Sequence, residues 1–222
     1  MQAIEVVLQQ KPRMRTIQVG SSFFDYPTGR EKDLGGGVQV WNGTFVSIRP
    51  TQWKMMLNVD TSATSFYKGQ PVLDFMCEFL GLRDYPRRLN KFQRETFAKE
   101  IKAIKVETTY MKRKQRASGL SFKSARDERS IAKEKYDVSL RYPDLPCVKI
   151  GQRSFIPLEL CQVVHGQKKQ RKLTGAKTQQ MIRYTTIPAP DRMQKIVELI
   201  RKFHYEGDPY CRDFGISVSN KW

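Results

Sequence analysis

Histidine and cysteine, the side chains that most often bind zinc, are scarce in this sequence. Its 222 residues include two histidines and four cysteines, Cys77, Cys147, Cys161 and Cys211. No two cysteines have the CxxC spacing of a zinc site, and two histidines are too few to complete one. The sequence therefore predicts no metal site and no cofactor. It predicts buried free thiols in a reducing compartment.

Long apolar runs are missing as well. The N-terminal stretch MQAIEVVLQQK has no secretory signal pattern, and no apolar run approaches the length of a membrane span. These features predict a cytoplasmic protein, with the nucleus as a second compartment, and no membrane partner.

Catalytic motifs are also absent. The sequence has no GxGxxG motif, no P-loop, no Ser/His/Asp or Cys/His arrangement and no clustered carboxylates for a metal-dependent nuclease. The three glycines Gly35–Gly37 are not followed by the GK[ST] of a P-loop, so they predict a loop. We therefore expect no enzyme active site in this chain.

Acidic residues are few relative to basic ones. Forty Lys and Arg face 22 Asp and Glu, which gives a net charge of +18 and a pI near 9.9. Such a field attracts polyanions, most often nucleic acid. A solubilising or ribosomal-type surface is the simpler alternative. An acidic membrane surface is a third, but no basic amphipathic helix supports it.

Along the chain, patterns alternate between helix and strand. A short helix is predicted to end over residues 3–9, and residues 21–37 are predicted to be loop. Val38–Pro50 predicts a hairpin that turns at Asn42-Gly43, because this pair readily adopts positive φ angles. Residues 53–67 predict a further strand.

Three helices are predicted from apolar spacing, over residues 71–82, 91–99 and 191–204. In the last, Met193, Ile196, Val197, Ile200 and Phe203 form a stripe that predicts core packing.

Residues 99–184 predict a β-rich block, with strands at IKVETTYM, LRY, CVKI and SFIPLELC and a turn at GQRS. Pro157 cannot donate to a strand ladder, so it indicates an edge strand or a bulge. Short strands and frequent turns predict an α+β chain built around a small, partly open barrel. A cleft at the rim of such a barrel suits a single strand of nucleic acid.

Positive charge gathers on either side of this block. Residues 111–135 carry nine basic and three acidic residues, and residues 165–183 carry six basic residues and no acid. A charge run alone predicts a solvated loop. Two runs that flank aromatic side chains favour single-strand binding through phosphate contacts and stacking. We expect Lys168, Lys169 and Arg171 to supply general phosphate attraction.

Long motifs resemble a known family. LRYPDLPCVKIG, FIPLELCQVV, RKLT and TQQMIR closely resemble the PAZ domain of eukaryotic Argonaute proteins. LGGGVQVWNG and SIRPTQWKMMLNVDTSATSFYKGQPV resemble the first interdomain linker, and APDRMQKIVELI and DPYCRDFGI the second. The resemblance implies the tail of an N domain (1–18), a first linker (19–98), a PAZ domain (99–184) and a second linker (185–222).

The resemblance implies that the barrel is OB-like and carries an α/β appendage. It also implies a small-RNA-binding module that anchors the 3′ end of a guide RNA. Its partners would be a small guide RNA, single-stranded or in a duplex with a two-nucleotide 3′ overhang, and the remaining Argonaute domains. The residues predicted to bind RNA are Tyr110, Arg113, Phe122, Lys135, Tyr136, Arg153, Phe155, Ile156, Lys172, Met181, Ile182 and Arg192.

The family pattern implies individual roles for several of these residues. Phe122 matches the aromatic that stacks on the terminal base, and Arg113 matches a phosphate-binding arginine. Tyr110 stands where animal members of the family often carry a histidine of the pocket for the terminal nucleotide. Lys135 and Tyr136 match a Lys-Tyr pair that contacts the backbone phosphates. Arg153 lies near a lysine that the family carries in this turn, and Ile156 matches an apolar contact to the last sugar. Met181 and Ile182 match residues that wedge against the seed bases of the guide. Arg192 matches an arginine that contacts the guide.

The sequence also departs from the family. The family normally has a phosphate-binding tyrosine just before the helix that contains its Lys-x-Lys-Tyr motif, and this tyrosine is absent from RSIAKEKY. Gln115 stands where a second pocket tyrosine is common. Ser21 replaces an arginine that often follows the Val-Gly of the first linker. Either the pocket is reduced or residues are missing from this segment. We expect a weaker phosphate grip. Two alternatives to an Argonaute module remain: a fragment of a PAZ-bearing nuclease related to Dicer, and a basic RNA-binding scaffold without end preference.

Overall fold

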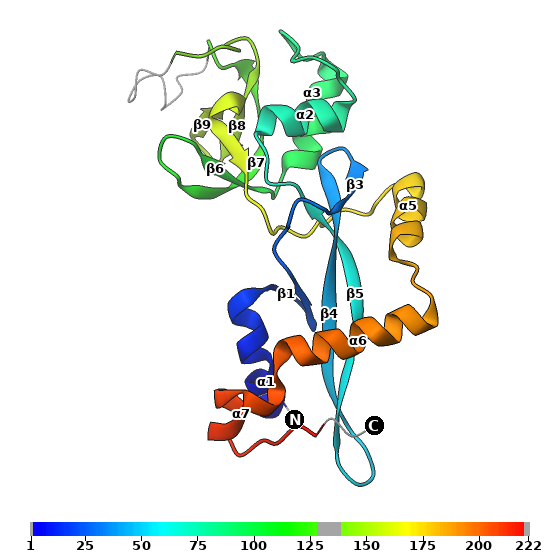
Figure 1. The fold of residues 1–222 in the computed structure, drawn as a ribbon. Helices are drawn as coiled ribbons and strands as arrows, with labels where there is room; N and C mark the ends of the chain where they lie inside the picture. Colours follow the sequence, from blue (N-terminus) through cyan, green and yellow to red (C-terminus); the bar gives the residue numbers. More distant parts are fainter. Residues whose placement is uncertain (1, 128–138, 220–222) are drawn as a thin grey trace. The chain divides into compact units, whose positions relative to one another are not determined.

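The computed structural model describes residues 2–127 and 139–219, and the chain divides into two units (Figure 1). The first unit comprises Met1–Lys32, Val40–Ser65 and Arg171–Trp222. The second unit comprises Asp33–Gln39 and Phe66–Gln170. The first is therefore assembled from three separate stretches of the chain.

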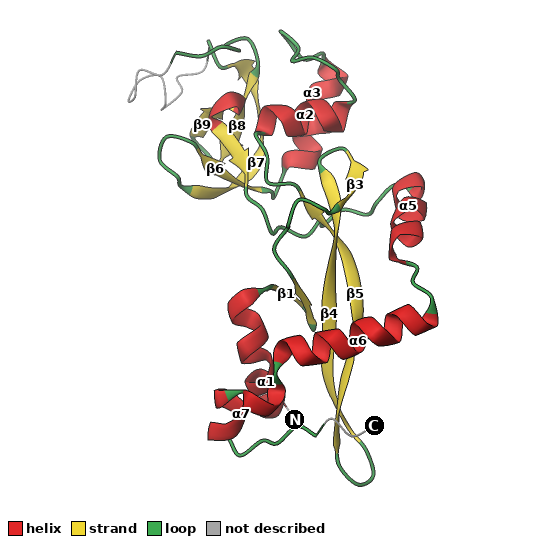
Figure 2. Cartoon of the chain, viewed as in Figure 1, coloured by secondary structure: helices red, strands yellow, loops and turns green. Residues whose placement is uncertain are grey.

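A long two-stranded ribbon forms the centre of the first unit (Figure 2). Its strands are β4 (Val38–Pro50) and β5 (Met55–Tyr67). The start of β4, up to Gln39, and the end of β5, from Phe66, belong to the second unit. Strand β4 also pairs with β2 (Ser22–Phe24), which in turn pairs with β1 (Ile17–Val19). The unit's helices are α1 (Gln2–Arg15), α5 (Gly175–Thr185), α6 (Ala189–Phe203) and α7 (Pro209–Asp213), with a short 3-10 turn η2 (Tyr205–Gly207).

The predicted hairpin at Asn42-Gly43 is wrong, because Val38–Pro50 is one continuous strand. The chain instead reverses over residues 51–54, where Thr51 and Lys54 bond to each other. Gly43 pairs with Phe24 of β2, and a Cβ at Gly43 would lie 2.4 Å from the carbonyl oxygen of Phe23. Glycine is therefore required there for close strand approach, not for a turn.

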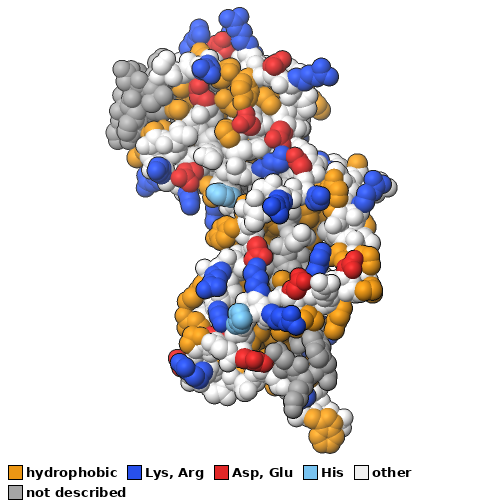
Figure 3. All heavy atoms as spheres, viewed as in Figure 1, with side chains coloured by type: hydrophobic (Ala, Val, Ile, Leu, Met, Phe, Trp, Pro, Cys, Tyr) orange, Lys and Arg blue, Asp and Glu red, His pale blue; other side chains and the backbone are white. Residues whose placement is uncertain are grey.

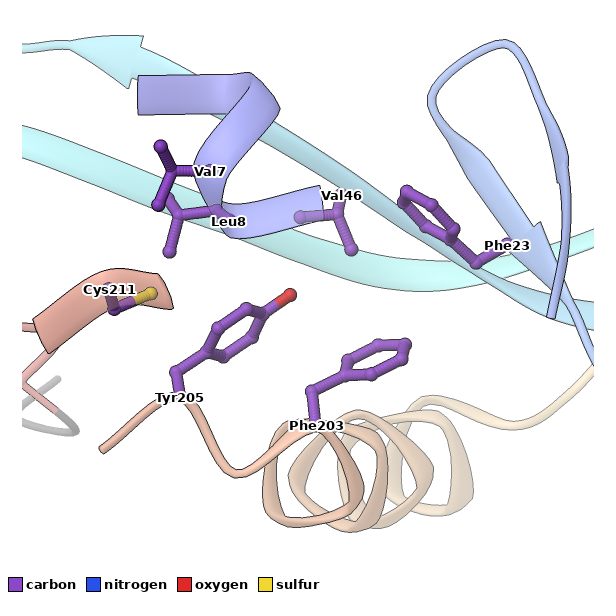
Figure 4. Close-up of a cluster of buried hydrophobic side chains, with 7 residues drawn as sticks. All are labelled: Val7, Leu8, Phe23, Val46, Phe203, Tyr205 and Cys211. Carbon is purple, nitrogen blue, oxygen red and sulfur yellow. The ribbon is translucent and has the colours of Figure 1, made fainter. Parts of the chain in front are cut away.

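The core of the first unit joins α1, β2, β4 and the C-terminal elements (Figure 4). The rings of Phe23 and Phe203 meet edge to face with centroids 6.4 Å apart, and Tyr205 follows at 5.8 Å from Phe203. The side chains of this core are Val7, Leu8, Phe23, Val46, Phe203, Tyr205 and Cys211.

Helix α6 confirms the predicted helix but not the predicted core stripe. Only Phe203 of the stripe is buried, whereas Met193 is 48% exposed and the three positions between them are half-buried. The reason is that α6 crosses the ribbon, where Arg192 bonds to Asp60 of β5, and reaches the core only with its last turn (Figure 1).

The second unit contains an open five-stranded antiparallel sheet in the order β10-β6-β7-β8-β9. Its strands are β6 (Lys105–Thr108), β7 (Lys114–Ser124), β8 (Pro146–Ile150), β9 (Ser154–Pro157) and β10 (Cys161–Val163), with the 3-10 turn η1 (Leu158–Leu160) before β10. In the part of the chain that is described, the sheet does not close into a barrel. The α+β class is confirmed, and Pro157 ends an edge strand as predicted.

Other predictions for the block at 99–184 need correction. The segment LRY is not a strand, the predicted strand SFIPLELC is split by η1, and residues 175–184 lie in helix α5. The eleven-residue strand β7 was not predicted, because basic residues and Gly119 obscure its alternation. A bulge at Ser118-Gly119 interrupts β7, and the Ser118 hydroxyl donates to the carbonyls of Lys149 and Gly151.

Helices α2 (Val72–Leu80) and α3 (Lys91–Ile101) cover this sheet and match their predicted positions. Strand β3 (Lys32–Gly35) pairs with the start of β4 beside them. The rings of Phe75 and Phe97 pack with centroids 5.6 Å apart, and Phe79 lies 6.1 Å from Phe97. The apolar face that the sequence predicts for α2 therefore forms part of the core of the second unit.

A buried ion pair joins three distant segments of the second unit. Lys169 binds Glu100 of α3, and both side chains are only 7% exposed. The hydroxyl of Tyr67, at the end of β5, donates to the same carboxylate at 3.0 Å, and the Lys169 ammonium lies 5.0 Å from the Tyr67 ring centroid. The prediction that Lys169 attracts phosphate is therefore wrong, because its charge is already paired inside the protein.

All four cysteines are free and buried, as predicted. Burial raises the pKa of the Cys161 thiol to about 12. In the described residues, no group of three or more potential metal ligands occurs, and no helix is both long and apolar enough to span a membrane.

Replacing Lys169 with methionine is expected to lower the free energy of unfolding by about 3–5 kcal/mol, because it leaves the Glu100 carboxylate buried without its cation. Lys168→Met, at an exposed neighbouring position, is the control and should stay within about 0.5 kcal/mol of the parent. Urea unfolding followed by circular dichroism measures both. Equal stabilities of the two variants would contradict a structural role for the buried pair.

Gly43→Ala is expected to lower the free energy of unfolding by about 1–3 kcal/mol, because the added methyl group collides with backbone of β2. Asn42→Ala, on the exposed side of the same strand, should have little effect. If Asn42-Gly43 formed a turn instead, Asn42→Ala would also destabilise the protein. The same unfolding measurement separates the two arrangements.

Candidate nucleic-acid interface

Among the described residues of the second unit, Phe122 has the most exposed aromatic ring, at 87%. Its neighbour on β7, Ser121, is buried and binds β8 by accepting a hydrogen bond from the Cys147 N–H at 3.0 Å. Successive side chains of a strand point to opposite faces, so this register holds Phe122 outward. An outward ring on a fixed strand is a surface on which a base can stack.

Arg94 of α3 supports this ring. Its guanidinium donates to the Phe122 carbonyl at 2.5 Å, and its Cζ lies 5.8 Å from the ring centroid. A cation over an aromatic face is attracted to the π electrons and also places positive charge beside any bound phosphate. Sequence reasoning missed Arg94, because nothing in the sequence pairs α3 with β7.

Tyr110 and Arg113 lie in the connection from β6 to β7. Thr108 closes this turn: its N–H donates to the Arg113 carbonyl at 3.2 Å, and its carbonyl accepts from the Lys112 N–H at 2.8 Å. Lys112 has a positive φ of 50°, which is uncommon for lysine and turns the chain sharply. The turn leaves Arg113 exposed and Tyr110 half-buried.

Arg153 lies at the same end of the sheet as this turn. Glu107 pairs with Lys114 and Ala117 pairs with Ile150, so the β6–β7 and β8–β9 connections leave the sheet on one side. Arg153 is exposed in the β8–β9 connection. The structure therefore groups Tyr110, Arg113 and Arg153 at one end of the sheet, while Phe122 lies further along β7, beyond the bulge.

Phe155 and Ile156 occupy β9 on opposite faces. Ile156 is 4% exposed and pairs with Val148, which places it in the core, and Phe155 is half-buried opposite Lys149. Phe155 is therefore more accessible to a ligand than Ile156.

The remaining residues predicted to bind RNA lie either in the first unit or outside the residues that the structure describes. Lys135 and Tyr136 lie outside the described residues. Lys172 is exposed, and on α5 Met181 is half-buried and Ile182 is 60% exposed.

Arg192 of α6 already has a protein partner. It is half exposed and pairs with the Asp60 carboxylate, which holds the pKa of Asp60 below its usual range and raises the pKa of Arg192. A phosphate at this position would therefore compete with Asp60 for the guanidinium.

Comparison with protein families identifies two segments of the chain. Residues 18–68 match the family model of the Argonaute linker 1 domain, and residues 132–182 match that of the PAZ domain. Both are non-catalytic parts of Argonaute proteins. The PAZ match includes β8, β9 and β10, and it begins within the residues that are not described.

A solved Argonaute structure has a similar fold. The Kluyveromyces polysporus Argonaute with a guide RNA superimposes with a TM-score of 0.72 over 88% of this chain at 21% identity. Drosophila Piwi covers 94% of this chain with a TM-score of 0.49 at 16% identity. The chain spans 26% and 27% of the lengths of these two proteins.

At this level of identity, the likeness to the Kluyveromyces polysporus structure concerns the fold. The family matches add the order of the domains. The predicted resemblance is thereby confirmed: residues 18–68 are similar to an Argonaute linker 1 domain, and residues 132–182, further along the chain, are similar to a PAZ domain.

Proposed function

We propose that this chain is the small-RNA-binding middle section of an Argonaute protein and that its PAZ domain anchors the 3′ end of a guide RNA. The observation that carries the proposal is the outward ring of Phe122, supported by Arg94, on a strand of the unit that contains most of the PAZ match. The net charge of +18 supplies the attraction for an RNA backbone.

The chemistry fits an RNA end better than internal backbone alone. A terminal base has a free face that can stack on Phe122, whereas internal bases of a duplex are already stacked on both sides. Exposed cations, among them Arg113, are available to bind phosphates, and a terminal ribose offers hydroxyls that distinguish RNA from DNA. The chain thus acts by binding, with no catalytic step of its own.

The proposal extends to the setting of the protein. The partners would be the guide RNA and the N, Mid and PIWI domains of the parent Argonaute. A role in RNA-mediated silencing would fit a location in the cytoplasm, with the nucleus as a second compartment.

Phe122→Ala is expected to weaken binding to an RNA duplex with a two-nucleotide 3′ overhang by about 1–3 kcal/mol, the usual contribution of one stacked base. Fluorescence anisotropy at fixed salt measures the Kd, with a blunt duplex and an overhang that ends in a 3′ phosphate as comparison ligands. The parent protein should prefer the free overhang.

Phe214→Ala provides the matched control, because Phe214 is also an exposed phenylalanine, at 70%, and lies in the first unit. It should leave the preference unchanged. Equal binding of all three ligands by the parent protein would contradict end recognition and favour a basic RNA-binding scaffold instead.

Arg113→Ala is expected to weaken binding of the overhang duplex and to lower the salt dependence of binding, because one phosphate contact is lost. For single-stranded RNA, the slope of log K against log salt should fall by about 0.7. Anisotropy titrations at several salt concentrations give this slope. An unchanged slope would remove Arg113 from the set of phosphate contacts.

A further inference from the structure

The connection between α2 and α3, residues 81–90, carries an unpaired cluster of positive charge. Arg83, Arg87, Arg88 and the adjoining Lys91 are all exposed. Within the described residues, none of these four side chains has an ion-pair partner, in contrast to Lys68, Lys169 and Arg192. Figure 3 shows Lys and Arg side chains at the tip of the second unit, where Figure 1 draws this connection.

The structure holds this connection at both ends. At its start, the Leu82 N–H donates to the Cys77 carbonyl, and Gly81 adopts the left-handed conformation that ends α2. At its end, Asn90 and Gln93 form a capping box on α3, with each side chain accepting the other's backbone N–H.

The middle of the connection is also held. The hydroxyl of Tyr85 donates to the Asp74 carboxylate of α2, and the Tyr85 ring meets Tyr142 edge to face at 5.3 Å. Asp74 is thereby occupied by tyrosine rather than by an arginine. The cations are presented from an ordered backbone, so binding an anion would not first have to order the segment.

The cluster adjoins the proposed stacking site through α3. Lys91 begins this helix, and Arg94 lies one turn further on, about 4.5 Å along the helix axis. Because Arg94 contacts Phe122, helix α3 links the charged connection to the exposed ring. A strand that ends at Phe122 therefore has a net positive surface beside it, because the four cations outnumber the one carboxylate of this connection, Asp84.

We propose that Arg83, Arg87, Arg88 and Lys91 bind the backbone phosphates of the nucleotides that precede the 3′ end of the same RNA strand. This inference rests on the proposed function, because it takes Phe122 as the position of the last base. The α2–α3 connection would then extend the interface beyond the PAZ match and add affinity that does not depend on sequence.

The test uses the whole chain and a labelled single-stranded RNA decanucleotide, with Kd values measured by anisotropy across a range of salt. The double variant Arg87→Ala/Arg88→Ala should bind more weakly, and its slope of log K against log salt should fall by about 1.4, or about 0.7 for each lost contact. Lys99→Ala/Lys102→Ala is the matched control, because it removes two exposed cations at the other end of α3. Its slope should fall by less.

The outcomes separate this inference from the proposed function. If the double variant keeps the slope of the parent protein while Phe122→Ala weakens binding, the connection does not contact RNA and only the further inference fails. If both pairs of substitutions lower the slope equally, the effect is one of net charge, which also overturns it. If Phe122→Ala binds RNA as tightly as the parent protein does, the proposed end recognition fails. The further inference then fails with it, because no RNA end would be held beside the cluster.

Discussion

The second unit depends on the buried contact among Lys169, Glu100 and Tyr67. Each residue comes from a different part of the chain: the segment after β10, helix α3 and the end of β5. A charge taken out of water is costly unless its partner and hydrogen bonds are in place. The three segments are therefore fixed together or not at all, and α3 in turn carries Arg94 to the ring of Phe122.

Features set by local patterns were predictable from the sequence. The apolar face of α2, with Phe75 and Met76 fully buried, follows from spacing alone, and so does the position of α3 behind Asn90. The edge strand that ends at Pro157 follows from the missing N–H of proline. Long ordered motifs indicated the similarity to the linker 1 and PAZ domains, because such motifs specify a whole fold rather than one element.

Features set by distant contacts were not predictable. Asn42-Gly43 has the composition of a turn, but β2 pairs across it and holds the strand straight. Lys169 lies in a basic run and looks exposed, yet Glu100, 69 residues away, draws it inside. Arg94 and Phe122 are likewise 28 residues apart in the sequence, so no local pattern predicts their contact.

The position of Tyr67 has a consequence for how the PAZ domain can be isolated. The unit that contains the five-stranded sheet also takes in residues 66–98, with α2 and most of α3. A fragment that starts at Lys99 would lack Phe75, Phe97 and Tyr67, so the sheet would lose its helical cover and the buried carboxylate its hydroxyl donor. The smallest stable excised domain is therefore expected to start at the end of β5, within the segment that sequence motifs assign to the linker.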